Sequence, residues 1–141
     1  MGVSSHLYLV ETSVWIRVFR RTAQQSVAER VRLLAEADSI ATNELISLEL
    51  ILGCRTQDEV NAVRDELASL VQLSIVRSTW RRAADLGFVL RRAGIVVRVP
   101  DLLVAASAID HDAVLLHADS DFDRIAANSA LRVESYVDVA P

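Results

Sequence analysis

Short apolar runs alternate with longer amphipathic stretches along most of this chain. Leu7 to Val10 and Val114 to His117 are apolar runs bounded by polar turns, as expected for buried strands of a parallel sheet. Ser39 to Ala41 and Leu73 to Val76 are weaker strand candidates. Helical patterns fill the intervals, at residues 13–20, 26–37, 43–53, 57–72, 79–94, 101–111 and 121–127. This alternation predicts an α/β fold, a three-layer α/β/α sandwich with a mostly parallel central sheet.

The composition is that of one globular unit. The chain has 141 residues, with only two prolines and four glycines, and contains no low-complexity stretch at which to divide it. Hydrophobic residues make up 52% of the chain, against 24% charged, which is enough for a real core. We therefore expect a single domain spanning residues 1–141.

Cysteine content and hydropathy bear on where in the cell this protein acts. The single cysteine, Cys54, excludes an intrachain disulfide and a zinc site built from several cysteines, so a reducing environment is expected. The N-terminus lacks the pattern of a signal peptide, and no apolar run approaches the roughly 20 residues needed to span a bilayer. The sequence predicts a cytoplasmic protein without a membrane partner.

The net charge of −4 argues against binding nucleic acid by bulk attraction, because non-specific affinity comes from neutralised phosphates. Any such contact must be local. All fifteen basic residues are arginine, and Arg17, Arg20 and Arg21 share one face of the first predicted helix. These three arginines are suitable for binding phosphate or an acidic partner, or they are simply exposed to solvent.

Acidic residues follow two of the predicted strands. Glu11 comes directly after the first, and Asp119 and Asp121 follow 114–117. In an α/β sheet, sites gather beyond the carboxyl ends of the strands. Glu11 is alternatively an ordinary loop acid, with Thr12 or Ser13 capping the next helix or orienting a metal ligand. Asp119 and Asp121 alternatively solvate a turn or favour a helix start.

Two further acids lie in predicted helices. Glu49 is the only charge in residues 45–54 and is flanked at helical spacing by Leu45, Leu48 and Leu52, so we expect it on an apolar face. A buried carboxylate there must pair with an arginine, protonate or bind a cation. Asp101 precedes a helix rich in small residues, where it is expected to cap the helix and to stay ionised.

Acids brought into one cleft repel one another and require a counter-charge. A hard divalent cation with oxygen ligands, Mg²⁺ or Mn²⁺, meets that requirement. A bound ion also reverses the local charge, which lets an anionic phosphodiester approach. The three histidines, including His117, are expected at the surface or in packing.

Four segments in this order, residues 8–15, 48–53, 100–106 and 115–126, resemble the VapC-type toxins of the PIN-domain nuclease family. The resemblance spans nearly the whole chain and implies an Mg²⁺-dependent endoribonuclease, a hydrolase for which Mn²⁺ is also suitable. It further implies a homodimer that cleaves RNA and is inhibited by a cognate antitoxin protein.

Carried onto this chain, the family's acidic quartet falls on Glu11, Glu49, Asp101 and Asp119. Asp121 is then an auxiliary acid, and Thr12 and Ser13 are supporting polar residues. The first acid of the family is normally Asp, and Glu11 is one methylene longer. The alternative is therefore a weakened PIN module that binds antitoxin or RNA without cleaving.

Other acid-rich α/β proteins fit less well. A dehalogenase-like phosphatase would carry its Asp-x-Asp near the start of the chain and a small residue where Phe122 stands. A response-regulator receiver needs a lysine, which this chain lacks. An EF-hand beginning at Asp119 would need Gly and Glu where Arg124 and Ala130 stand.

Overall fold

A five-stranded sheet, parallel throughout, forms the centre of the computed structural model, which describes residues 6–140. The strand order is β3-β2-β1-β4-β5. The strands are β1 (Tyr8–Val10), β2 (Ile40–Thr42), β3 (Val71–Gln72), β4 (Val114–His117) and β5 (Arg132–Ser135). The predicted α/β sheet is confirmed. Its first and fourth strands lie side by side at the centre, with Val10 opposite Leu116.

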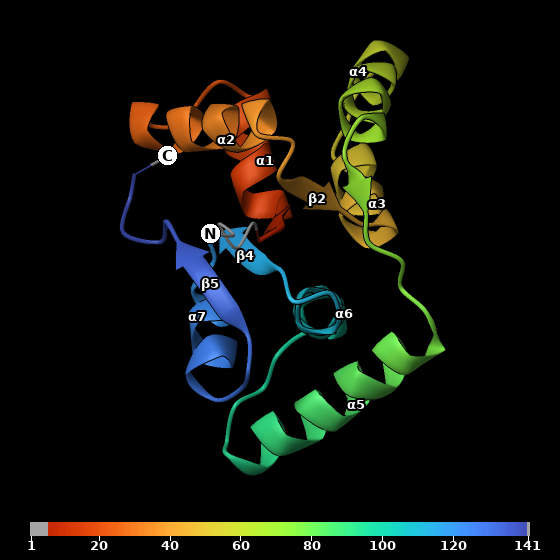
Figure 1. Ribbon diagram of the computed structural model, residues 1–141, viewed down its shortest axis with the longest axis vertical. Coiled ribbons are helices and arrows are strands. Elements are labelled where there is room, and N and C mark those ends of the chain that lie inside the picture. Colours follow the sequence, from red (N-terminus) through yellow and green to blue (C-terminus); the bar gives the residue numbers. More distant parts are fainter. Residues whose placement is uncertain (1–5, 141) are drawn as a thin grey trace, which may run out of the picture.

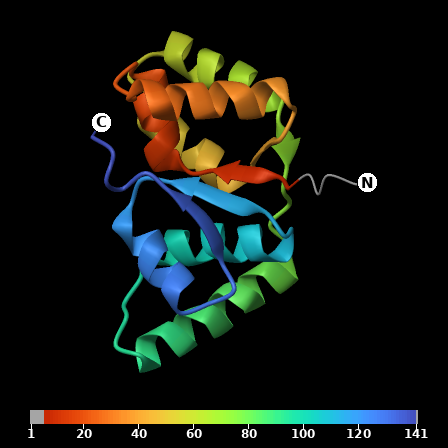
Figure 2. The same ribbon diagram turned by 60° about the vertical axis from the view of Figure 1, so that its left-hand side comes forward.

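Helices cover both faces of the sheet, which gives the three layers (Figures 1 and 2). They are α1 (Thr12–Phe19), α2 (Gln25–Glu36), α3 (Glu44–Leu52), α4 (Gln57–Ala68), α5 (Arg77–Arg92), α6 (Val99–Asp110) and α7 (Ser120–Ala127). Figure 2 shows α1, α2 and α4 on one side of the sheet and α5, α6 and α7 on the other. No helix within residues 6–140 is long and apolar enough to cross a membrane.

The core lies on both faces of the two central strands. Leu9, Leu115 and Leu116 are fully buried, as expected for apolar runs in a sheet covered on both sides. Trp15 of α1 and Phe122 of α7 are the largest fully buried side chains packed there. Removing each such side chain from water contributes about 1.5–3 kcal/mol, so these residues fix α1 and α7 against the ends of β1 and β4.

The third strand corrects the predicted boundaries. Residues 73–76 were expected to form it and 57–72 to be helical, but α4 ends at Ala68 and β3 is Val71–Gln72. The Gln72 side-chain amide donates to the carbonyl of Leu67, which closes the helix end. The Leu73 N–H donates to the Thr42 carbonyl, so pairing with β2 begins earlier than the apolar pattern indicates.

The fifth strand was not predicted. Residues 132–135 include one apolar side chain, Val133, and none of the four residues is fully buried, because β5 is an edge strand. Its position is secured by ion pairs instead: Glu134 accepts two 2.9 Å hydrogen bonds from Arg30 of α2. Sequence patterns that depend on continuous apolar residues do not detect such a strand.

Candidate metal centre

Two neighbouring parallel strands each deliver an acid to the same edge of the sheet. Glu11 follows β1, and its N–H donates to the Leu116 carbonyl of β4 at 2.9 Å. Asp119 follows β4 and is the N-cap of α7, where it accepts a hydrogen bond from the Asp121 N–H. Parallel pairing therefore places both carboxylates beyond the carboxyl ends of the strands, as the sequence predicted.

Glu11 is itself the N-cap of α1, which corrects the expectation that Thr12 or Ser13 would cap the helix. Its Oε2 accepts a 2.8 Å hydrogen bond from the Ser13 N–H and a second, very short one from the Ser13 hydroxyl. The Ser13 Oγ also accepts from the Ala118 N–H at 2.9 Å. Ser13 therefore ties Glu11 to the loop that carries Asp119.

Glu49 reaches the same region from α3. The Thr12 hydroxyl donates to its Oε1 at 2.9 Å. The predicted apolar face is wrong, because α3 packs through Ile46 and Leu50, and Leu48 and Leu52 are 52% and 76% exposed. Glu49 consequently lies partly exposed beside the packed face, so burial alone does not force it to find a counter-charge.

Asp101 lies in the first turn of α6, whose N-cap is Arg98 and which begins at Val99, so Asp101 does not cap the helix as expected. The cap position moves because Pro100, which lacks an N–H, occupies the first turn without loss. Asp101 is only 3% exposed, and its Oδ2 has no hydrogen-bond partner among residues 6–140. A buried oxygen of this kind is costly unless something binds it.

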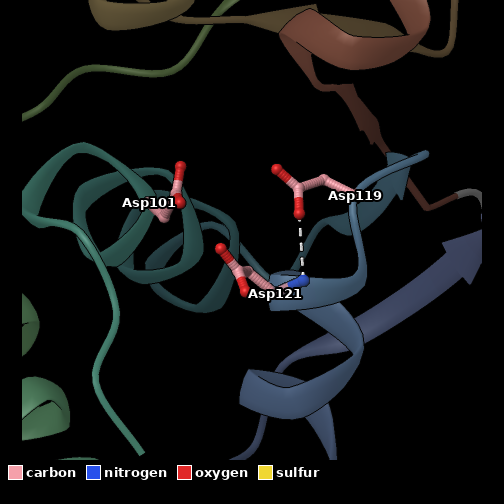
Figure 3. A group of neighbouring side chains, drawn as sticks. All are labelled: Asp101, Asp119 and Asp121. Carbon is pink, nitrogen blue, oxygen red and sulfur yellow. Dashed lines mark hydrogen bonds between the residues drawn. The ribbon is translucent and has the colours of Figure 1, made fainter.

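One carboxylate oxygen each from Asp101, Asp119 and Asp121 lies within 4.8 Å of the others (Figure 3). Asp101 extends from α6, whereas Asp119 and Asp121 extend from the start of α7. Three of the predicted site residues, from the first turns of two different helices, therefore lie close together.

The shifts of the pKa values show that Glu11 and Glu49 interact electrostatically with this cluster. Burial raises the pKa of Glu11 to about 7, against the hydrogen bonds from Ser13 and with further repulsion from Glu49 and Asp101. Burial also raises the pKa of Asp101, which Arg98 opposes and which Asp119 and Glu49 reinforce. All four acids of the predicted quartet thus share one electrostatic environment.

His117 supports this site in a way that sequence reasoning did not identify. The side chain is fully buried, and its Nδ1 accepts a 3.1 Å hydrogen bond from the Asp119 N–H. Burial lowers its pKa despite nearby Asp123, whose Oδ1 lies 3.0 Å from Nε2. In the neutral ring, Nδ1 accepts from the Asp119 N–H, whereas the buried Nε2 makes no hydrogen bond within residues 6–140. The only signal in the sequence was a histidine two residues before an acid.

The predicted arginines separate in the structure. Arg17 donates to the Val139 carbonyl at 2.9 Å and so holds the C-terminal segment. Arg20 and Arg21 are exposed, and Arg20 lines a groove of about 570 Å³ that Glu49 also borders. Of the three, Arg20 is therefore the one whose surface is continuous with the acidic site.

The residues present fit a divalent cation. Every clustered donor is a carboxylate oxygen, the ligand type that Mg²⁺ and Mn²⁺ prefer. The buried Asp101 Oδ2 accepts no hydrogen bond from residues 6–140 and has only a 3.6 Å ion pair with Arg98, so it can still bind a cation. A cation would also relieve the repulsion that raises the pKa values of Glu11 and Asp101.

Comparisons with known proteins identify the family of this chain. The sequence matches the PIN domain over residues 8–128. It is 35% identical over 133 residues to Ribonuclease VapC11 of Mycobacterium tuberculosis, covering 92% of this chain and 99% of that protein. Ribonuclease VapC51 of the same organism is 34% identical over 121 residues, with 85% of each chain covered.

Solved structures show the same fold. A VapBC2 structure from Rickettsia felis, bound to a promoter DNA fragment, superposes with a TM-score of 0.78 at 21% identity, covering 92% of this chain and 98% of the other. VapBC-5, a toxin–antitoxin system member from Mycobacterium tuberculosis, gives 0.63 at 27% identity, covering 92% and 97%. With a family match over most of the chain and relatives above 30% identity, this protein belongs to the PIN-domain family and, within it, to the VapC group.

Proposed function

We propose that this protein is a divalent-metal-dependent endoribonuclease that acts as the toxin of a toxin–antitoxin pair. The observation that carries the proposal is the approach of Asp101, Asp119 and Asp121 oxygens within 4.8 Å, one residue of the three having a buried oxygen without a hydrogen bond. The VapC ribonucleases that the chain resembles support RNA as the substrate.

In this proposal Glu11, Glu49, Asp101 and Asp119 form the catalytic centre, and with Asp121 they hold Mg²⁺, or Mn²⁺ in its place. When bound, the ion would polarise the phosphodiester and lower the pKa of a water molecule that attacks it. The protein's own contribution is orientation. Ser13 fixes the Glu11 carboxylate, Thr12 fixes Glu49, and His117 fixes the backbone of Asp119. No side-chain nucleophile is needed.

Glu11 is a working member of this centre. The weakened module without cleavage is not favoured, because the resemblance to named ribonucleases covers nearly the whole chain. The local geometry supports this conclusion. Two hydrogen bonds from Ser13 hold the longer side chain, and its carboxylate lies in electrostatic contact with Glu49 and Asp101.

The partners follow from the same family. The VapBC structures are toxin–antitoxin systems, which supports a cognate antitoxin as the inhibitor. A homodimer is the assembly expected from the family, and a cellular RNA substrate would support activity in the cytoplasm. Arg20 and Arg21, both exposed near the first helix end, are the proposed contacts for RNA or antitoxin.

The test is to incubate the purified protein with total RNA in Mg²⁺, Mn²⁺ or chelator and to map new RNA ends. We expect specific ends with either ion, none with chelator, and none from Asp101→Asn. Asp112→Asn is the matched control, because Asp112 is exposed and pairs with Arg132 away from the cluster. The same ends from Asp101→Asn would refute the proposal.

A further inference from the structure

Arg98 brings a positive charge to the rim of the carboxylate cluster. Its side chain is 69% exposed, and its Nε lies 3.6 Å from the Oδ2 of Asp101. That separation is an ion pair but exceeds hydrogen-bond length. The Asp101 oxygen is the same buried atom that has no hydrogen-bond partner. Arg98 therefore neutralises Asp101 from outside without being fixed to it.

Its influence extends beyond Asp101. Attraction to Asp101 raises the pKa of Arg98, and Glu49 and Asp119 add to the effect. These acids come from α6, α3 and the loop after β4, so one guanidinium interacts electrostatically with acids from three segments of the chain. Among residues 6–140, Arg124 also pairs with the cluster, through Asp121 at 3.4 Å.

The ion pair between Arg132 and Asp112 contains hydrogen bonds that the Arg98–Asp101 pair lacks. Arg132 donates to the Asp112 carboxylate at 2.6 Å and to the Asp112 carbonyl at 2.9 Å, which anchors its guanidinium at two points. Arg98 has neither contact with its own partner. The attraction between opposite charges is therefore what holds Arg98 at Asp101, and this contact can be broken by a competing cation.

We propose that Arg98 is a phosphate-binding residue of the RNA site that changes partner when a divalent ion is present. It neutralises Asp101 in the metal-free protein and binds a phosphate of the RNA once the acids are occupied. This inference rests on the proposed function and assigns an RNA contact beside the carboxylate cluster to the N-cap residue of α6.

The physical reason is competition between two cations for the same carboxylates. An ion at the cluster satisfies Asp101 and repels the guanidinium, which then needs another anion. The fork of donors on arginine matches two phosphate oxygens. Because the chain has a net charge of −4, phosphate binding needs such a local cation. Metal and RNA binding should consequently be coupled through Arg98.

The first measurement is calorimetric titration of the full-length, metal-free protein with Mn²⁺. Arg98→Gln should bind Mn²⁺ about two- to fivefold more tightly than wild type, because a competing cation of exposed ion-pair strength is removed. Arg132→Gln is the matched control, with the same charge change, and should bind Mn²⁺ as wild type does. Arg98→Lys, which retains the charge, should restore the wild-type affinity.

The second measurement is fluorescence anisotropy with a short polyuridylate phosphorothioate, which resists cleavage. In Mn²⁺, Arg98→Gln should bind this RNA about tenfold more weakly than wild type, and the slope of log Kd on log salt should fall by about 0.7, one phosphate contact. In chelator the two proteins should bind alike, since Arg98 is then engaged with Asp101.

Unchanged or weaker Mn²⁺ binding by Arg98→Gln would overturn the inference, since Arg98 would then only support Asp101. Tighter Mn²⁺ binding with unchanged RNA affinity would overturn it equally. Failure of the proposed function is distinct: wild-type protein would not bind Mn²⁺ at all, or would bind it and yield no new ends from total RNA.

Discussion

Two glutamates of this protein, Glu11 and Glu134, are both removed from solvent, but their pKa values shift in opposite directions. Glu134 of β5 is partly buried, and although burial acts to raise its pKa, hydrogen bonds from Arg30 and Tyr136 hold it below the usual range. Glu11 is more deeply buried, has no arginine partner among the described residues, and has a pKa of about 7.

The contrast separates charges that support the fold from charges reserved for a ligand. The Arg30–Glu134 pair joins α2 to an edge strand that has little apolar surface of its own. The carboxylates around Asp101 repel one another and leave a buried oxygen without a hydrogen bond. A protein retains such an unfavourable cluster where function requires it, because unpaired buried charge lowers stability.

The largest expected effect is on catalysis. Asp101→Asn should reduce metal-dependent RNA cleavage by at least about a hundredfold, because it removes a charged oxygen from the centre of the cluster. Initial rates on a mapped RNA substrate measure this loss. The fold should persist, so an unchanged circular dichroism spectrum is the accompanying control, and a loss of less than severalfold would argue against the assignment.

The next effect is on stability, and it depends on pH. Because the folded pKa of Glu11 is about 7 and its ordinary value is 4.5, the folded protein retains a proton that the unfolded chain loses between these values. Glu11 therefore destabilises the metal-free protein fully above pH 7 and not below pH 4.5. Glu11→Gln should raise the free energy of unfolding by about 1–3 kcal/mol near pH 8.

Urea unfolding in chelator at about pH 4.5 and pH 8 measures the difference. The gain from Glu11→Gln should vanish at the lower pH. An equal gain at both pH values would mean that the substitution acts through packing and not through the charge.

The paired glutamate should behave in the opposite way. Glu134→Gln should lower the free energy of unfolding by about 0.5–1 kcal/mol at neutral pH, a modest loss because the pair is partly exposed. Since the pKa of Glu134 is lowered in the folded state, this stabilisation is present above pH 4.5 and is lost as pH falls through the folded value. Stabilisation by Glu134→Gln at neutral pH would remove the contrast with Glu11.

The smallest expected effect is on the residue that departs from the family. Glu11→Asp should change the cleavage rate by less than about tenfold, because under the proposed function Glu11 already acts in the centre and the substitution keeps the carboxylate charge. Matched rates at several Mn²⁺ concentrations test this. A rise well beyond tenfold would instead favour the weakened module.

The sequence predicted the central part of the molecule and missed its edges. The strands β1 and β4 and the acids after them were identified because buried parallel strands have continuous apolar runs. The strand β5 was missed because its stability comes from Glu134 and its distant partner Arg30, which share no local pattern. The end of α4 was misplaced because Leu70 and Val71 suit a helix as well as a strand.

The sequence proposed which residues form the candidate site, and that membership stays a prediction, whereas the geometry came only from the fold. The order and spacing of the four segments that resemble the family identified Glu11, Glu49, Asp101 and Asp119. They did not predict which side chain caps which helix. The role of His117 depends on two contacts made only in the fold, with the Asp119 N–H and with Asp123. The open pairing of Arg98 is likewise visible only once Asp101 is seen to be buried.

The most direct test of the central claim is Mn²⁺ binding measured by calorimetry near pH 8, where Glu11 is ionised. Wild-type protein and Asp112→Asn should bind the ion with equal affinity, and Asp101→Asn should bind it at least about tenfold more weakly. Equal binding by all three proteins, or none by the wild type, would contradict the claim that these clustered carboxylates form a metal centre.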